Sequence, residues 1–511
     1  MSAEIQLVVP MTGVGQRFID AGFRTLKPLI ATEVGTMIQN VLNGFPSIDA
    51  PLCIINKDAR DKELLILELK RTRPKVRIVE IPPHKKGPSF AIWQAREHIN
   101  LSLPVIVSYC DFSGFWSEKE FFEQIGLSDG LIQTYTGFHP HMIRSNRFAY
   151  VKKDAEGNVI GIQEKSPYTN DPMAEEASSG IYGFRTGELL IEAIRKQIEN
   201  NISLNGEFYT SLTYKPLLEQ KLKIKTIQME RFFQWGTPED LKDFNFWTRL
   251  SRNELPTSIS ANESSAIVLA AGSGLRIVEL AQIEKPFISV FGKPLWFFTA
   301  SIFQNCREKI LFSNEQNESK FSSNNPFEFR IVLRDRATKS QSESALVALK
   351  SVMNTSKPVH IVACDNVFLA DRFEKLRELF DKADLVIWVT RDYSGASLQK
   401  NQFSWVSTGP TGEVTKLFVK ADNPEAGAAM LVGNFSFKSA SMASKLIQRT
   451  LDERTDSSAE VYLDWVTATA INTGYRVFAF EVRDFWAIGT ADEFRTLQYW
   501  HKVFEKSGEI N

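Results

Sequence analysis

A glycine turn followed by an arginine stands near the start of the chain and occurs again past its middle. In both places a short apolar run precedes the turn. Glycines there let backbone N–H groups approach phosphate oxygens, and the helix start that follows adds partial positive charge. The P-loop pattern G-x-x-x-x-G-K-[ST] is absent, and Phe18 and Ile277 occupy the third glycine position of the dinucleotide fingerprint. The turns therefore indicate a phosphate site of another kind, with the residues Gly13, Gly15 and Arg17 in the first and Gly272, Gly274 and Arg276 in the second.

A lysine and an aspartate follow each turn in the same order. Lys27 and Lys285 each precede a proline, and Asp111 and Asp365 each end an apolar run in Cys-Asp. A carboxylate at the carboxyl end of a strand lies where ligands bind in open α/β sheets. The aspartates could otherwise be strand-end caps, but the position favours a functional site.

The spacing of these residues indicates that the chain contains two copies of one domain. Gly13 and Gly272 differ by 259 positions, and Lys27 and Lys285 differ by 258. The offset is 254 for the aspartates and 253 for later pairs, such as Gly180 with Gly433 and Glu207 with Glu460. Chance matches would not keep their order with so slow a drift, which small loop deletions explain. The sequence therefore predicts a tandem duplication.

The elements that must position these residues alternate between strand and helix. Apolar β-rich runs alternate with helical patterns such as SFAIWQAREHI and ELLIEAIRKQI. This alternation predicts two tandem Rossmann-like α/β domains, each a mostly parallel mixed sheet flanked by helices. The predicted domains are residues 1–250 and 266–511, joined by a polar linker at 251–265. The helix before the linker, LKDFNFWTRL, is expected to pack back on the first domain.

Composition excludes several classes of partner. Lys+Arg 60 against Asp+Glu 61 gives a net charge of −1, which provides no global attraction for nucleic acid or anionic lipid. No apolar run is long enough to cross a bilayer. Four cysteines without metal-ligand spacing favour a reducing, cytoplasmic setting. A homo-oligomer is left open.

The ordered set of motifs resembles the sugar-phosphate nucleotidyltransferases, which have a GT-A-like fold. The first half matches through VVPMTGVGQRFIDAGFRTLKPLI, SYCD, IQEK, SSGIYGF, NGEFY and WGTPEDL, and the second through LAAGSGLR, EKPFISVFGKPL, VACD and IGTADEF. The resemblance implies transfer of a nucleoside monophosphate from a triphosphate to a sugar 1-phosphate with Mg²⁺, releasing pyrophosphate. Polysaccharide biosynthesis consumes such products.

The resemblance also implies roles for individual residues. Arg17 and Lys27 would hold the triphosphate and the departing pyrophosphate, and Asp111 would bind Mg²⁺. Lys165 would hold the sugar phosphate, and Gly180 would let substrate approach the backbone. The basic loop His84–Ser89 lies where the family holds the nucleotide, although a solvated loop is an equal alternative. The nucleotide-binding candidates are Gly13, Gly15, Gly87, Gly272, Gly274, Arg276 and Lys285, the substrate-binding ones are Glu164, Lys165, Gly180 and Glu207, and the metal ligands are Asp111, Gln234 and Asp365.

Two departures from the family pattern separate the copies. Where several members have a second carboxylate metal ligand, the first copy has Gln234 and the second has Ala487. An amide oxygen can bind a hard cation weakly, whereas a methyl group cannot. The second copy also has Val419 before Lys420, where the first has Glu164 before Lys165. We therefore expect the first copy to be catalytic and leave the second open, with Asp464 or Asp484 as other candidate metal ligands.

Other functions compete with this interpretation. A cytidylyltransferase acting on a non-sugar phosphate is the closest rival, and a non-catalytic protein that senses nucleotide or sugar nucleotide is another. A GT-A glycosyltransferase is disfavoured because no Asp-x-Asp follows a strand. His139 and His141 suggest a metal pair, but no cysteine or carboxylate accompanies them at ligand spacing, so a loop is predicted there.

Overall fold

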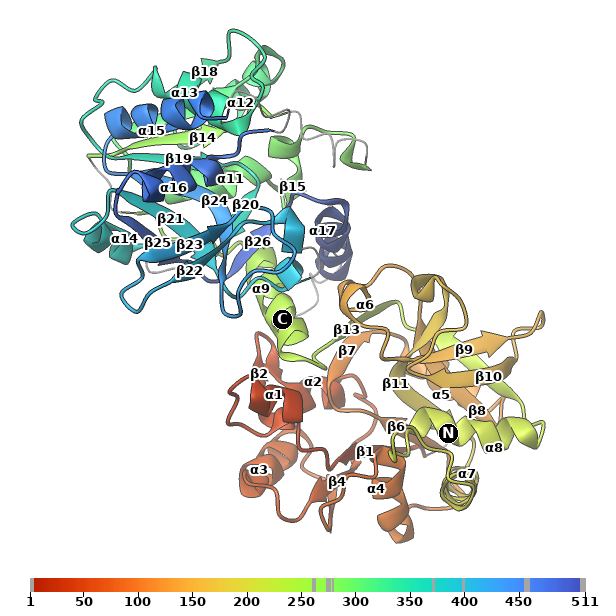
Figure 1. Cartoon of the computed structure of the whole chain (residues 1–511). Helices are drawn as coiled ribbons and strands as arrows, with labels where there is room; N and C mark the ends of the chain where they lie inside the picture. The colour runs from red at the N-terminus through yellow and green to blue at the C-terminus, as the bar shows by residue number, and fades with distance from the viewer. Residues whose placement is uncertain are drawn as a thin grey trace. The chain divides into compact units, whose positions relative to one another are not determined.

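The computed structural model describes residues 4–259, 263–272, 277, 280–369, 373–397, 400–454 and 460–505. The chain divides into two compact units, Met1–Asn245 and Phe246–Asn511. Each unit contains a nine-stranded mixed sheet with helices on its faces (Figure 1). Within the described residues, no helix is long and apolar enough to cross a membrane.

The first sheet has the strand order β10-β9-β11-β6-β1-β4-β5, with β8 paired to β11 and β12 paired to β8. Strands β5, β4, β1 and β6 are parallel, and β11 runs antiparallel to β6. The strands are β1 (Gln6–Met11), β4 (Leu52–Asn56), β5 (Arg77–Ile81), β6 (Val105–Ser108), β8 (Gly130–Tyr135), β9 (Ala149–Lys153), β10 (Val159–Glu164), β11 (Glu176–Phe184) and β12 (Ile224–Gln228). Short pairs outside it are β2 (Ala31–Thr32) with β3 (Gly35–Thr36), and β7 (Phe112–Phe115) with β13 (Arg231–Gln234).

The second sheet repeats this order and every strand direction, as β23-β22-β24-β19-β14-β17-β18 with β21 and β25 in the places of β8 and β12. Its strands are β14 (Ser265–Leu269), β17 (Glu308–Ser313), β18 (Arg330–Leu333), β19 (Val359–Ala363), β21 (Leu385–Thr390), β22 (Trp405–Thr408), β23 (Val414–Phe418), β24 (Ala429–Phe437) and β25 (Val477–Glu481). Short pairs are β15 (Ser289–Val290) with β16 (Lys293–Pro294), and β20 (Asn366–Phe368) with β26 (Phe485–Ala487). The predicted α/β fold is confirmed, and it occurs in two copies.

Helices cover both faces of the first sheet because its central strands are apolar on both sides. One face packs against α2 (Met37–Asn43), α3 (Lys62–Thr72) and α5 (Glu118–Ile125). The other face packs against α4 (Pro88–Gln94), α7 (Gly187–Glu199) and α8 (Tyr214–Glu219). The short helices α1 (Gln16–Asp20) and α6 (Pro140–Arg144) lie in loops between these elements.

The second unit has corresponding layers. Helices α13 (Gln341–Leu349), α15 (Ala440–Asp452) and α16 (Leu463–Asn472) pack on one face of the sheet. Helix α11 (Leu295–Ile302) is almost wholly buried and contacts β14 and β20. Further helices among the described residues of this unit are α12 (Glu318–Ser323), α14 (Glu374–Leu379) and α17 (Ala491–Phe504).

Helix α9 (Pro238–Ser251) contains the division between the units, because the chain from Phe246 onward groups with the second unit. The ring of Trp247 is fully buried and lies 5.1 Å from that of Trp486 and 6.5 Å from that of Trp500. The second half of the helix therefore packs with the second unit, whereas the sequence led us to expect it against the first domain. Large aromatic side chains explain the difference, since they stabilise whichever core buries them. The linker is also partly packed, because Ile259 is buried and donates its N–H to Ile302 O at 2.8 Å.

Candidate active site

The predicted site lies at the point of each sheet where the strand order reverses. Strands β1 and β6 are parallel neighbours in the first sheet, and the chain continues from β1 to β4 on the opposite side. The glycine turn follows β1, and Asp111 follows β6. Ligands of open α/β sheets bind at such a switch point, outside the carboxyl ends of the strands.

Gly15 is required by its conformation and by the side chain beside it. Its φ is +69°, and a Cβ there would lie 3.1 Å from the Cβ of Lys27. Phe18, in the following α1, is buried, and the Lys27 ammonium lies 5.4 Å from its ring centre. Gly13 is exposed, a Cβ added to it would meet no atom within 4 Å, and Arg17 is exposed at the start of α1. The turn thus fixes where Lys27 lies and presents Arg17 to solvent.

Lys27 and Asp111 form an ion pair at the centre of the site. Lys27 Nζ donates to Asp111 Oδ2 at 2.6 Å, and their side chains are 17% and 30% exposed. Trp235 N–H donates to the backbone oxygen of Asp111 at 2.7 Å, which ties the late Trp-Gly-Thr segment to the end of β6. The carboxylate is therefore held at the sheet edge with a balancing positive charge, in a place that solvent reaches.

Gln234 ends β13, which pairs with β7, and its register partner is Phe112, the residue after Asp111. Its side-chain amide nitrogen donates to Asp240 Oδ2 at 3.0 Å. Burial raises the pKa of Asp240, although the positive charge of Arg144 opposes this effect. Arg144 bridges Asp240 and Asp243 at 2.9 and 2.7 Å. Gln234 is therefore held by its nitrogen end.

Lys165 belongs to a hydrogen-bonded chain that the sequence did not predict. Its ammonium donates to the hydroxyl of Tyr209, which donates to the carboxylate of Glu207. The ammonium lies 4.3 Å from the Tyr209 ring centre, and Lys165 has a left-handed φ of +58° directly after β10. Burial and the hydrogen bond to Glu207 raise the pKa of Tyr209, so the phenol keeps its proton. Tyr209 thereby brings Lys165 and Glu207 together.

Glu164 ends β10 and Gly180 lies in β11, with β9 between the two strands in the sheet. Glu164 Oε2 accepts a hydrogen bond from Ser211 Oγ at 2.5 Å. Burial raises the pKa of Glu164, and the bond to Ser211 opposes the increase. Gly180 has a φ of +102°, and its carbonyl accepts from Tyr109 N–H at 3.1 Å. The predicted substrate-binding residues therefore share one end of the first sheet.

The loop before α4 packs against the chain near Phe208. Gly87 has a φ of +82°, and a Cβ there would lie 2.8 Å from Phe208 N and from Phe208 O. Ser89 N–H donates to Phe208 O at 3.0 Å, so the two segments are joined through their backbones. His84 Nδ1 accepts from Lys86 N–H, and its Nε2 lies 3.4 Å from Thr12 Oγ1 in the glycine turn. The loop is thus connected to the glycine turn, and Gly87 has a packing role there.

The second copy contains the same central ion pair. Lys285 Nζ donates to Asp365 Oδ2 at 2.5 Å, and Ile488 N–H donates to Asp365 O at 3.0 Å. Burial would lower the pKa of Lys285, but the charge of Asp365 outweighs it and raises the pKa. A Cβ on Gly489 would lie 3.7 Å from the Lys285 ammonium and 3.8 Å from Asp365 Oδ2. Gly272 follows β14 as predicted, whereas Gly274 and Arg276 lie outside the described residues.

The other predicted metal ligands of the second copy have different partners. Asp484 Oδ2 accepts from Arg249 Nη1 at 2.8 Å, and Asp464 accepts from Ser404 Oγ at 2.5 Å. Ala487 is the register partner of Asn366 and occupies the position of Gln234. Across the described part of the chain, no three His, Cys, Asp or Glu side chains cluster as a metal site.

His139 and His141 belong to a buried aromatic cluster. They flank Pro140, which begins α6, so the predicted loop is wrong and a short helix stands there. His141 Nε2 lies 3.1 Å from the Tyr135 hydroxyl, and burial lowers the pKa of both histidines, that of His139 to about 4. Both rings are packed in the core, which agrees with their exclusion as a metal pair.

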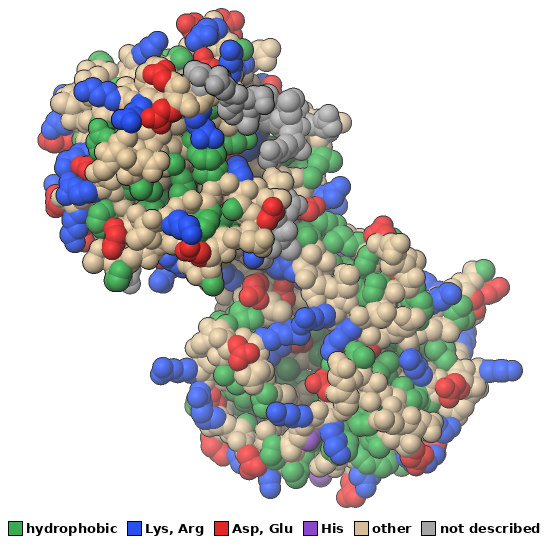
Figure 2. Space-filling model, viewed as in Figure 1, with side chains coloured by type: hydrophobic (Ala, Val, Ile, Leu, Met, Phe, Trp, Pro, Cys, Tyr) green, Lys and Arg blue, Asp and Glu red, His purple; other side chains and the backbone are tan. Residues whose placement is uncertain are grey.

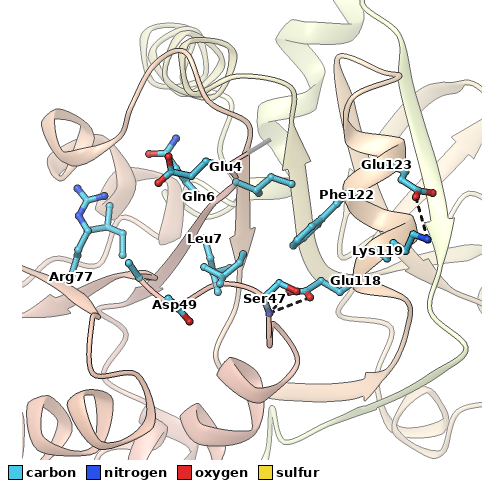
Figure 3. Close-up of a pocket in the computed structure, with 14 residues that line it drawn as sticks. Glu4, Gln6, Leu7, Ser47, Asp49, Arg77, Glu118, Lys119, Phe122 and Glu123 are labelled. Atoms are coloured by element: carbon cyan, nitrogen blue, oxygen red, sulfur yellow. Dashed lines mark hydrogen bonds and ion pairs between the residues drawn. The ribbon is translucent and has the colours of Figure 1, made fainter. Parts of the chain in front are cut away.

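A cavity of about 870 Å³ lies at the opposite, amino-terminal edge of the first sheet (Figure 3). Gln6 and Arg77 begin strands that line it, and Phe122 contributes from α5. Three of its acidic side chains have partners, since Glu118 accepts from Ser47 N–H, Glu123 pairs with Lys119 and Asp49 pairs with Lys75. None of the predicted site residues lines this cavity.

Charged side chains of both signs are interspersed on the face shown in Figure 2. A hollow opens on this face of the first unit, with Lys and Arg side chains near its edge. This distribution agrees with local anion sites within a nearly neutral chain.

Tyr109, Tyr209 and Ser211 are contacts of the site that the sequence analysis missed. Tyr209 follows Glu207 within Glu-Phe-Tyr, and the second copy repeats the pattern as Glu460-Val-Tyr. That repeated tyrosine was a signal that could have identified Tyr209. Nothing comparable marks Tyr109, because Ala363 stands at its position in the second copy.

Comparison with known proteins finds a family match in the second half of the chain. The nucleotidyl transferase family matches residues 265–501. A nucleoside-diphosphate-sugar pyrophosphorylase from Vibrio cholerae RC9 is 21% identical, with a TM-score of 0.40 over 47% of this chain and 98% of that one. An inositol-1-phosphate CTP transferase from T. maritima is 17% identical, with a TM-score of 0.37 over 49% of this chain and 98% of that one. No curated protein matches the chain.

Proposed function

We propose that this chain is a sugar-phosphate nucleotidyltransferase, because residues 265–501 match the nucleotidyl transferase family and the fold occurs twice. It transfers a nucleoside monophosphate from a nucleoside triphosphate to a sugar 1-phosphate or a related phosphorylated metabolite, and it releases pyrophosphate. A cytoplasmic location belongs to the same proposal.

The observation that carries this proposal is the ion pair between Lys27 and Asp111 beside the glycine turn. It combines an ammonium for phosphate oxygens with a carboxylate for a cation, at the switch point of the sheet. A purely structural ion pair would not need a glycine turn against the lysine, and Gly15 lies there with a left-handed backbone. The same pair recurs in the second copy at 2.5 Å.

The residues present fit Mg²⁺ as the partner of the triphosphate. Asp111 supplies one carboxylate. The side-chain amide nitrogen of Gln234 is bonded to Asp240, which leaves the carbonyl oxygen of this amide for a cation. Mg²⁺ commonly takes one or two protein ligands and fills its remaining positions with water and substrate phosphates. When bound, the ion would neutralise the charge that develops on the phosphates.

The remaining chemistry is positioning and charge stabilisation. A phosphate oxygen of the sugar 1-phosphate forms a bond to the α-phosphorus, and the bond from that phosphorus to the β-phosphate oxygen breaks. Arg17 and Lys27 hold the departing pyrophosphate, and the backbone of Gly13 and Gly15 approaches the triphosphate. Lys165 orients the attacking phosphate, and its position is fixed by Tyr209. No protein group needs to form a covalent bond.

We place the reaction in the first copy. Gln234 provides a polar side chain opposite Phe112, the residue after Asp111, where the second copy has Ala487 opposite Asn366. Because the second half matches the nucleotidyl transferase family, the proposal includes a nucleotide site in the second copy as well.

Pyrophosphate release from a panel of nucleoside triphosphates tests the proposal. Each triphosphate is mixed with Mg²⁺, the full chain and either glucose 1-phosphate or a non-sugar phosphate such as inositol 1-phosphate. Release that depends on both substrates supports the enzyme, and preference for CTP with the non-sugar acceptor would identify the cytidylyltransferase instead. Binding without any release would leave a sensor of nucleotides as the function.

A further inference from the structure

The end of each sheet that carries Lys165 or Lys420 is called the acceptor end here, because the proposed function places the sugar phosphate there. The backbone at this end has the same conformation in both copies. Lys165 and Lys420 follow equivalent strands, and both have left-handed φ values, +58° and +50°. The Lys420 ammonium lies 4.7 Å from the Tyr462 ring centre, as that of Lys165 lies 4.3 Å from the ring of Tyr209. A lysine over a tyrosine therefore stands at the same place in each copy.

In the first copy, two aromatic rings lie beside Gly180 at the acceptor end. Gly180 is buried, and a Cβ there would lie 3.0 Å from the ring of Phe112 and 3.3 Å from that of Tyr109. The Tyr109 hydroxyl accepts from Thr210 N–H at 3.2 Å, so its ring extends from the end of β6 to the segment after Tyr209. These rings limit the size of any group that approaches Gly180.

The second copy lacks both rings. Ala363 and Asn366 stand at the positions of Tyr109 and Phe112. A Cβ on Gly433 would lie 3.6 Å from Ala363 Cβ and 3.9 Å from Asn366 Nδ2, which are ordinary contacts, and Gly433 is partly exposed. Gly433 therefore has a methyl group and an amide beside it, where Gly180 has two aromatic rings.

Both copies have a carboxylate at the acceptor end, but a different segment of the chain carries it in each copy. In the first copy Glu164, on the strand, accepts from Ser211. In the second copy Asp464, at the position of Ser211, accepts from Ser404, whose counterpart Ala149 is the register partner of Glu164. The hydroxyl and the carboxylate have thus exchanged positions between the two segments, and the hydrogen bond between them is 2.5 Å long in both copies. An exchange in which both partners change together preserves a carboxylate facing this end.

We propose that the second copy is a separate binding site for a sugar 1-phosphate that carries a substituent larger than a hydroxyl, such as an acetamido group. Lys420 binds its phosphate, Asp464 accepts a hydrogen bond from a ring hydroxyl, and the substituent occupies the space that Tyr109 and Phe112 fill in the first copy. This inference rests on the proposed function for the identity of the acceptor end.

Calorimetric titration of the full chain tests the inference one copy at a time. Lys165→Ala disables the acceptor end of the first copy, and Lys420→Ala disables that of the second. The probes are N-acetylglucosamine 1-phosphate, glucose 1-phosphate and inorganic phosphate. We expect the Lys165→Ala chain to bind the acetamido sugar at least about tenfold more tightly than the Lys420→Ala chain does, since a well-packed group of this size is worth a kcal/mol or more.

Two further changes separate recognition from general damage, both made in the Lys165→Ala chain. Ala363→Tyr should weaken the acetamido sugar about tenfold and leave glucose 1-phosphate nearly unchanged. Asp464→Asn should weaken both sugar phosphates about tenfold but not inorganic phosphate, because only the sugars present hydroxyls. If Ala363→Tyr prevents folding, Tyr109→Ala in the Lys420→Ala chain should instead allow the first copy to bind the acetamido sugar.

No binding of either sugar phosphate by the Lys165→Ala chain would overturn the inference, as would equal losses for all three probes. These titrations do not require turnover. Absence of pyrophosphate release would therefore contradict the proposed function while leaving a binding result in place.

Discussion

The two copies have the same ion pair and differ in what surrounds it. Lys27 with Asp111 and Lys285 with Asp365 are joined at 2.6 and 2.5 Å on sheets of identical strand order. The second copy carries the family match, whereas the first has a polar residue, Gln234, where the second has Ala487. Sequence similarity to a family and the set of polar groups at a site are therefore separate properties, and each has to be tested in each copy.

The largest expected effect is the loss of turnover on removing the first aspartate. Asp111→Asn should lower pyrophosphate release about a hundredfold or more, because the cation loses its charged ligand beside the reacting phosphorus. Asp365→Asn is the matched control, and it should have the smaller effect on the same reaction. Steady-state rates over the whole triphosphate panel check this. If Asp365→Asn alone silences release, the second copy is the working site.

Removal of the lysine from each pair should give the next largest effect. Lys27→Ala should slow turnover on the order of a hundredfold, since one donor to the departing pyrophosphate is lost. Arg17→Ala should act in the same direction. Lys285→Ala is the control in the second copy, and its rate should stay nearer that of the unchanged chain. Equal rates for Lys27→Ala and the unchanged chain would remove the first pair from the mechanism.

Alanine substitutions at the residue before α4 and at the residue before α13 should differ in their effect on stability. Gly87→Ala forces a Cβ to within 2.8 Å of the Phe208 backbone at a φ of +82°, so we expect a loss of about 3 kcal/mol in the unfolding free energy of the first unit. Ser340→Ala, at the equivalent place, removes a helix cap to Glu343 N–H and should cost only about 1 kcal/mol. Gly13→Ala is the control, because no atom lies within 4 Å of its Cβ position. Urea unfolding with pulse proteolysis assigns each loss to its unit, and equal costs at Gly87 and Gly13 would contradict the packing role.

The smallest expected effect is a difference in acid sensitivity. Burial lowers the pKa of His139 to about 4 and that of His360, in the second unit, to about 3. The unfolded chain protonates these rings first, so their stabilising contribution is complete above pH 6.5 and is lost as the pH falls toward those values. Each ring should contribute about 1 kcal/mol per pH unit to the loss.

The first unit also buries His141, so its unfolding free energy should fall more steeply below pH 6.5 than that of the second. Pulse proteolysis in urea between pH 7 and 5 measures both slopes. His360→Gln should flatten only the slope of the second unit, and an unchanged slope would show that other groups govern it.

The fold was largely predictable because the signals that determine it are local. Largely apolar runs such as Leu52–Asn56 are typical of central parallel strands, and the slowly drifting offset between the copies predicted a repeated fold. The domain boundary inside α9 was harder to predict, because a helix with Trp247 on one face can bury this side chain against either neighbouring domain.

The site was only partly predictable because its contacts are distant in sequence. Position after a strand identified Asp111, but its separation of 84 positions from Lys27 concealed their ion pair. The exchange of carboxylate and hydroxyl between Glu164 and Asp464 was not visible either, since each partner lies on a different element and no spacing rule links them. Asp464 was instead considered as a metal ligand, whereas its hydrogen bond from Ser404 directs it to the acceptor end.

The closed Lys27–Asp111 pair has a consequence for the order in which ligands arrive in the proposed reaction. A free cation approaching Asp111 meets an ammonium 2.6 Å away and is repelled by it. A cation already bound to a triphosphate would bring its own anionic oxygens, and Lys27 could then leave the carboxylate for a phosphate. Asp111 and Lys27 would each keep a partner of opposite charge throughout this exchange. Under the proposed function, addition would therefore be ordered, and the triphosphate and its cation would bind together.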